Sequence, residues 1–226
     1  MPPHAAFALE WGHMQADARA IEDFVETLAR TDATPNSVNP WDYTRTENAI
    51  RRANLKTYLE IILESKPAVL LVGEAPGYRG TRRTGVPFSA EKIVLSHPFF
   101  TDRPEFAIEH VDDPIAESSA SVVWKTMDEL QFYPLIWASF PFHPHEPGND
   151  LTNRAPTKEE LVLGQTFLRQ LIDLSGIKTV LAVGRAAEKT LIQMDIPIAA
   201  QIRHPSHGGA TRFKEGLRAF LESTGR

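Results

Sequence analysis

The sequence predicts an α/β fold with three layers, in which helices cover both faces of a central, mainly parallel sheet of four strands. Two observations support this prediction. Short apolar runs alternate along the chain with longer segments whose apolar residues recur at helical spacing. The runs lack polar alternation, which is typical of strands buried on both faces of a parallel sheet. They are Ala68–Val72, Leu135–Ser139, Lys178–Val183 and Pro197–Ile202.

The segments around these runs predict amphipathic helices with recognisable ends. Capping boxes are expected at Thr44 with Glu47 and at Thr157 with Glu160, and the second helix should end at Gly176. Asp17 is the expected N-cap of the first helix, and Gly184 should open a short one. The apolar faces are Ile21, Phe24, Val25 and Leu28; Leu55, Tyr58, Leu59 and Ile62; Val123, Met127 and Leu130; Leu161, Leu168, Leu171 and Ile172; and Phe213, Leu217, Phe220 and Leu221.

Length and composition predict one domain over residues 1–226, in which residues 1–65 form a helical N-terminal extension packed on the rest. The absence of cysteine excludes disulfides, thiolate zinc sites and cysteine-held iron–sulfur clusters, so no cofactor is expected. No signal-peptide pattern opens the chain and no run approaches the ~18 apolar residues of a membrane span. We therefore expect a cytoplasmic monomer without a membrane partner. At a net charge of −5, any DNA contact requires a local basic patch.

Ligands of parallel sheets bind beyond the carboxyl ends of the strands. Three loops should meet there: Gly73–Phe88, Phe140–Pro156 and Arg203–Gly209. The first is rich in glycine, which permits close approach of the backbone to a ligand. Glu74 follows the strand directly, and Arg79, Arg82 and Arg83 form a compact basic cluster. A flexible surface loop with solvated charges is the alternative interpretation.

The other two loops carry histidines. His204 follows the last strand, so its imidazole is placed to donate to a developing anion, and Ser206 with nearby amides is suited to a phosphate. A helix-capping turn with incidental histidines is the alternative. His143 and His145 in the middle loop suggest a metal-dependent hydrolase, but no third ligand is evident, and His97 and His110 are unassigned. We expect a rigid wall there and no metal.

Several motifs together resemble the uracil-DNA glycosylase superfamily. Gly73–Gly77 (GEAPG) followed by Gly85–Phe88 (GVPF) is similar to its first motif, and most similar to the branch with an iron–sulfur cluster. Asn153–Glu160 is similar to the segment after the middle strand of that branch, and His204–Ser206 (HPS) resembles the second motif. The resemblance covers the chain from about Val69 to Phe213 and implies an enzyme that flips a deaminated base out of DNA and cleaves its N-glycosidic bond.

The resemblance also implies roles for single residues. Phe88 would stack on the flipped base, His204 would donate to its O2, and Glu74 would face the sugar or orient water. Base and sugar would contact Gly73, Ala75, Pro76, Gly77, Ala138 and Ser139. DNA would contact Pro205, Ser206, His207 and Gly208, together with the basic cluster Arg79, Arg82 and Arg83.

The sequence departs from the family pattern at three places. The cluster-binding cysteines are absent, and Ala138 occupies the place where many members read uracil with an Asn, with Ser139 as a partial substitute. His207 and Gly208 replace the bulky residue that enters the duplex, which favours single-stranded or mismatched DNA. Two hypotheses follow: a glycosylase for uracil or a related deaminated base, or a nucleic-acid or nucleotide-binding member that has lost catalysis.

Overall fold

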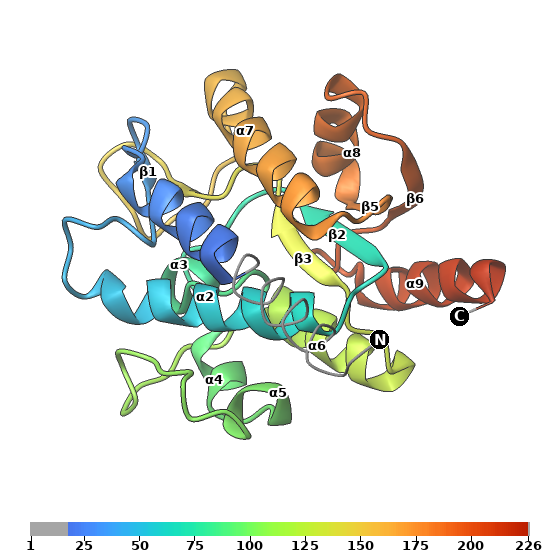
Figure 1. Cartoon of the computed structure of the whole chain (residues 1–226), viewed down its shortest axis with the longest axis horizontal. Helices are drawn as coiled ribbons and strands as arrows, with labels where there is room; N and C mark the ends of the chain where they lie inside the picture. Colours follow the sequence, from blue (N-terminus) through green and yellow to red (C-terminus); the bar gives the residue numbers. More distant parts are fainter. Residues whose placement is uncertain (1–17, 226) are drawn as a thin grey trace, which may run out of the picture.

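The computed structural model describes residues 18–225, and its central sheet has four parallel strands (Figure 1). The strands lie in the order β3-β2-β5-β6 and are β2 (Val69–Gly73), β3 (Leu135–Ala138), β5 (Thr179–Val183) and β6 (Ile198–Ile202). Each neighbouring pair is parallel. Every residue of the central strand β2 is buried, which explains why its sequence is apolar throughout.

Helices cover both faces of this sheet (Figure 1). One face carries α6 (Ser118–Leu130) and α9 (Ala210–Thr224), and the other carries α7 (Lys158–Ser175) and α8 (Gly184–Gln193). The helix over residues 18–30 joins the second face, where the ring centroids of Phe24 and Phe167 lie 6.4 Å apart. The three-layer α/β/α fold predicted from the sequence is therefore confirmed.

The free edge of β3 is covered by α2 (Asn48–Glu64). The Ile136 backbone N–H donates to the Tyr58 hydroxyl at 2.9 Å, so this helix satisfies a donor that an edge strand would otherwise leave open. The predicted capping box at the start of α2 is wrong. Glu47 is the N-cap without a side-chain bond, and the hydroxyl of Thr44 donates to Asp42 Oδ1 instead.

The predicted ends of α7 agree with the structure. The capping box of Thr157 and Glu160 opens α7, which ends at Gly176 with φ 64°. The remaining predicted helices and the four strands are present with shifts of a residue or two at their ends, a range in which element boundaries normally vary. The predicted N-cap Asp17 lies outside the described residues.

Several short elements are absent from the sequence prediction. They are β1 (Ser37–Val38), which pairs antiparallel with β4 (His143–Pro144), and the single turns α3 (Thr81–Thr84), α4 (Glu91–Val94) and α5 (Pro98–Thr101). They are too short to show a period in the sequence. Across residues 18–225 we find no helix with the length and apolar character required to cross a bilayer.

Candidate active site

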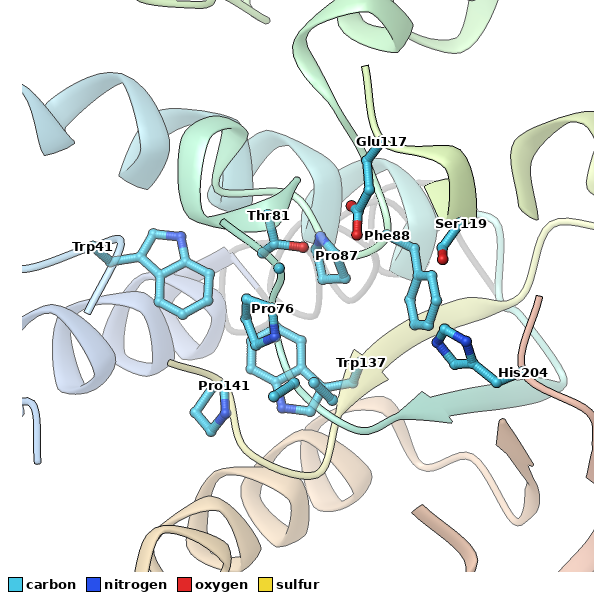
Figure 2. A pocket seen from close by; sticks show the side chains of 13 residues that line it. Trp41, Pro76, Thr81, Pro87, Phe88, Glu117, Ser119, Trp137, Pro141 and His204 are labelled. Atoms are coloured by element: carbon cyan, nitrogen blue, oxygen red, sulfur yellow. The ribbon is translucent and has the colours of Figure 1, made fainter. Parts of the chain in front are cut away.

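A cavity of about 50 Å³ opens at the carboxyl ends of the strands (Figure 2). The three predicted loops contribute Pro76, Pro141 and His204 to its lining, so their expected convergence is confirmed. The segment just before α6 adds Glu117 and Ser119. Glu117 and His204 are the ionisable side chains among the residues that line the cavity.

Phe88 is held at the end of β2 by a close approach that only glycine allows. A Cβ atom on Gly73 would lie 2.5 Å from Cε2 of the Phe88 ring. Phe88 itself has φ 48°, a region that residues other than glycine rarely adopt, and its carbonyl accepts a hydrogen bond from Trp124 Nε1 at 2.9 Å. Such strain persists where the surroundings fix it, so the ring forms a rigid apolar surface beside the cavity.

His204 is held as a neutral hydrogen-bond donor. Its Nδ1 accepts the Ser206 backbone N–H at 3.1 Å and lies 2.7 Å from the Ser206 hydroxyl, so the ring hydrogen resides on Nε2. Burial, with a smaller contribution from Arg203, lowers the pKa of His204 to about 4. The His204 and Phe88 ring centroids lie 6.0 Å apart. A ligand beside Phe88 therefore meets an imidazole that is uncharged at neutral pH.

Two carboxyl groups are near the strand ends, and they differ in position. Glu117 lines the cavity, whereas Glu74 does not, although it directly follows β2. Burial raises the pKa of both side chains, that of Glu117 to about 7. Figure 2 shows the Glu117 carboxyl and the His204 imidazole on either side of the Phe88 ring. The cavity thus combines an apolar surface, a neutral donor and a carboxyl group.

Comparison with known proteins identifies the family. The family model described as "Uracil DNA glycosylase superfamily" matches residues 62–223. The chain belongs to the uracil-DNA glycosylase superfamily. A search of curated proteins found no match. Among solved structures, the crystal structure of wild-type SMUG2 of Pedobacter heparinus matches with a TM-score of 0.69 and 16% identity, over 92% of this chain and 98% of that one. At that identity the likeness shows the shared fold.

Most residues that the uracil-DNA glycosylase resemblance places at base and sugar do meet in the structure. Those that line the cavity are Ala75, Pro76, Gly77, Phe88, Ala138 and His204. Gly73 lies beneath the Phe88 ring. Ser139 is buried, and its hydroxyl donates to the Gly73 carbonyl at 2.9 Å instead of lining the cavity, so it is not placed to substitute for an Asn.

The residues predicted to contact DNA lie around the cavity and fall into two groups. Arg79, His207 and Gly208 are exposed. The other side chains are engaged within the protein: Arg82 pairs with Asp150, Arg83 pairs with Glu91, Pro205 is buried and Ser206 bonds to His204. The roles of both groups in DNA binding stay predictions.

Sequence reasoning missed several cavity residues of this member of the superfamily. Two of them, Thr81 and Pro87, lie inside the predicted first loop, but their residue types did not indicate a place in the cavity. Trp41, Glu117 and Ser119 come from outside the three loops. The signal for Glu117 was its place at the start of a predicted helix that follows the first strand, since in this fold that helix begins near the carboxyl edge of the sheet.

The histidine pair of the middle loop is arranged for support. His143 is buried, and its two ring nitrogens face the carbonyl oxygens of Pro76 and Asp150 at 2.9 and 3.2 Å. Neither nitrogen directs a lone pair toward open space, as a metal ligand must. Over residues 18–225 no group of three His, Cys, Asp or Glu side chains is placed to share a metal. His143 instead fixes the Pro76 wall of the cavity.

Proposed function

We propose that this chain is a monofunctional DNA glycosylase that flips uracil or a related deaminated base out of DNA and hydrolyses its N-glycosidic bond. The observation that carries the proposal is the neutral imidazole of His204 beside Phe88, with its Nδ1 occupied by Ser206. The Nε2–H remains for a ligand in the cavity. A stacked pyrimidine on Phe88 would bring a carbonyl oxygen within reach of this donor.

The chemistry of the reaction explains why a neutral donor is suited to it. Cleavage of the bond between sugar and base leaves negative charge on the base and positive charge on the sugar. A donor fixed before the reaction stabilises the leaving base, and neutrality avoids repulsion of the cationic sugar. The sequence assigns the matching carboxylate to Glu74, and this assignment stays a prediction that Glu74→Gln tests.

Because of Ala138, the proposed function includes several deaminated bases and not uracil alone. This residue lines the cavity with a methyl group where many members carry an amide, so no side-chain hydrogen bond at that position discriminates uracil from related bases. The same feature supports a second candidate, a binding protein of the same fold that recognises nucleic acid or nucleotides without cleaving them. We further propose that the chain acts as a monomer in the cytoplasm, on single-stranded or mismatched DNA.

The test is a set of end-labelled oligonucleotides, single-stranded and duplex, each with one uracil, hypoxanthine or xanthine. After incubation, mild alkali breaks the strand at any abasic site, and gel analysis measures the fraction broken. We expect breakage with at least one base, most of it in single strands or mismatches, and loss of it in His204→Ala. Binding without breakage in the whole set would support the second candidate.

A further inference from the structure

Glu117 lies at the start of a helix but does not cap it with its side chain. It is the N-cap residue of α6, with φ −121° and ψ 125°, yet its side chain makes no capping hydrogen bond. The side chain turns into the cavity instead (Figure 2). Glutamate at this position gives up the capping that a Ser, Thr, Asn or Asp would supply, which is worth about 1 kcal/mol.

The loop after β2 is shaped around the Glu117 carboxyl group. A Cβ atom on Gly77 would lie 2.8 Å from Glu117 Oε1, and one on Gly80 would overlap Oε2 and come within 2.9 Å of the Ser89 carbonyl oxygen. A side chain at position 80 would therefore clash with the carboxyl and with the backbone, and a side chain at position 77 would require the carboxyl to shift. Two glycines of the first motif region thus make room for a side chain that lies far along the sequence.

The carboxyl has no counter-charge. Within residues 18–225 no hydrogen bond or ion pair partners its side chain, and desolvation is the cause of the shift that raises its pKa to about 7. The cavity's other titratable group, His204, is neutral. Near the preceding Ile115, Arg83 and Glu91 pair with each other. A positive charge that forms in the cavity would therefore meet an uncompensated carboxylate.

The position of Glu117 suits the sugar better than the base. Phe88 packs over Gly73 at the strand end, next to Ala138, which pairs with Gly73 in the sheet. Glu117 packs over Gly77 and Gly80, farther along the loop and away from that end. If a base stacks on Phe88 with its sugar directed toward the loop, that sugar lies beside Glu117.

We propose that Glu117, and not Glu74, is the catalytic carboxylate of this site, and that it faces the deoxyribose and accepts a proton from the attacking water. This inference rests on the proposed glycosylase function. The C1′–N bond breaks and its electron pair leaves with the base, which His204 stabilises by donation from Nε2. The water oxygen bonds to C1′ and its proton passes to Glu117. The base anion takes a proton from solvent, which leaves an abasic sugar and the free base.

The test is single-turnover cleavage, at pH 5 to 9, of a uracil-containing single strand or of the substrate that the oligonucleotide set identifies. The variants are Glu117→Gln, Glu117→Asp, Glu74→Gln and, as a matched control, Glu129→Gln at the exposed far end of the same helix. We expect Glu117→Gln to lower the rate by about 100-fold or more. The wild-type rate should rise with pH through about 7 as the carboxyl ionises and level off above it, and Glu117→Gln should lack that rise.

The other outcomes separate the two proposals. Glu117→Asp keeps the charge and should retain the pH-dependent rise at a lower rate, whereas Glu129→Gln should match wild type. If wild type cleaves and Glu117→Gln cleaves equally well with an unchanged pH profile, the role of Glu117 is refuted and the glycosylase function stands. A pH-dependent rise lost only in Glu74→Gln returns the role to Glu74. If wild type cleaves no oligonucleotide, the glycosylase proposal and the role of Glu117 fall together.

Discussion

Glu160 and Glu117 both lie at the start of a helix, but Glu160 is buried whereas Glu117 is half-buried in the cavity wall, and their surroundings are opposite. Glu160 accepts hydrogen bonds from Arg154 Nη1 and Nη2 at 2.6 and 2.7 Å, from the Thr34 hydroxyl at 2.7 Å and from the Thr157 N–H at 2.7 Å. Glu117 has no such partner among residues 18–225. Desolvation raises the pKa of both, but the donors of Arg154 and Thr34 outweigh it at Glu160 and lower the pKa there.

The difference indicates what each carboxyl group is for. A buried charge with all its hydrogen bonds made ties segments together, and here it joins α7 to the chain near Thr34. A partly buried charge without partners lowers the stability of the fold. Such groups persist mainly where function requires them. Under the proposed mechanism, Glu160 is a structural carboxylate and Glu117 is a functional one.

The largest expected effect is a loss of stability when Glu160, like Glu117, is left without a cationic partner. Arg154→Met leaves Glu160 buried without its cation, which should lower the free energy of unfolding by about 3–5 kcal/mol near pH 7. Urea denaturation measures it, with Arg30→Met as the control because the Arg30–Glu26 pair is exposed and should contribute nothing measurable. The loss should shrink at low pH, where Glu160 is protonated. If the two variants were equally stable, the Arg154–Glu160 pair would not be a structural ion pair of the kind described above.

The next effect concerns the donor opposite Glu117. His204→Ala removes the Nε2–H and should lower the single-turnover rate by about 10²–10³-fold, while the protein still binds an uncleavable strand. His110→Ala is the control, because His110 is exposed and does not line the cavity. Rates similar in both variants would show that no donor at position 204 stabilises the leaving base.

A smaller effect is expected on stability. Burial on folding raises the pKa of Glu117 from its ordinary value of 4.5 to about 7. The stability linked to this shift is fully present below about pH 4.5 and is lost as pH rises through about 7, because the folded state resists ionisation. Glu117→Gln removes this loss. We expect its melting temperature to exceed that of wild type by a few degrees at pH 8, and by less at pH 4. A lower value at pH 8 would mean that the carboxylate stabilises the fold.

The sequence could predict those parts of the fold and the site that depend on local patterns. The four strands and the capping box at Thr157 are local patterns, and the structure confirms them. The start of α2 was predicted wrongly, because Asp42 competes for the Thr44 hydroxyl and the box pattern does not record competitors. Glu117 was missed because its place at a helix start does not by itself distinguish it from other residues at helix starts. Its role depends on Gly77 and Gly80, which only folding brings to it.

The smallest effect extends the same comparison to the arginines of the first loop. The sequence assigned Arg79, Arg82 and Arg83 alike to DNA, but Arg82 and Arg83 pair with Asp150 and the buried Glu91. Arg79 is exposed and lies over the Tyr78 ring, 5.2 Å from its centroid. A charge that is free to contact phosphate releases a counterion on binding, whereas a paired one does so less.

Arg79→Ala should therefore weaken binding of single-stranded DNA a few-fold, to a similar extent for all sequences, and should reduce the slope of log K against log salt by about 1. Arg83→Ala should instead lower stability, because it leaves Glu91 buried without its cation. Lys178→Ala, an exposed change before β5 at the opposite end of the sheet, is the control. Fluorescence anisotropy at several salt concentrations measures the slopes. An unchanged slope in Arg79→Ala would mean that DNA does not contact this side of the cavity.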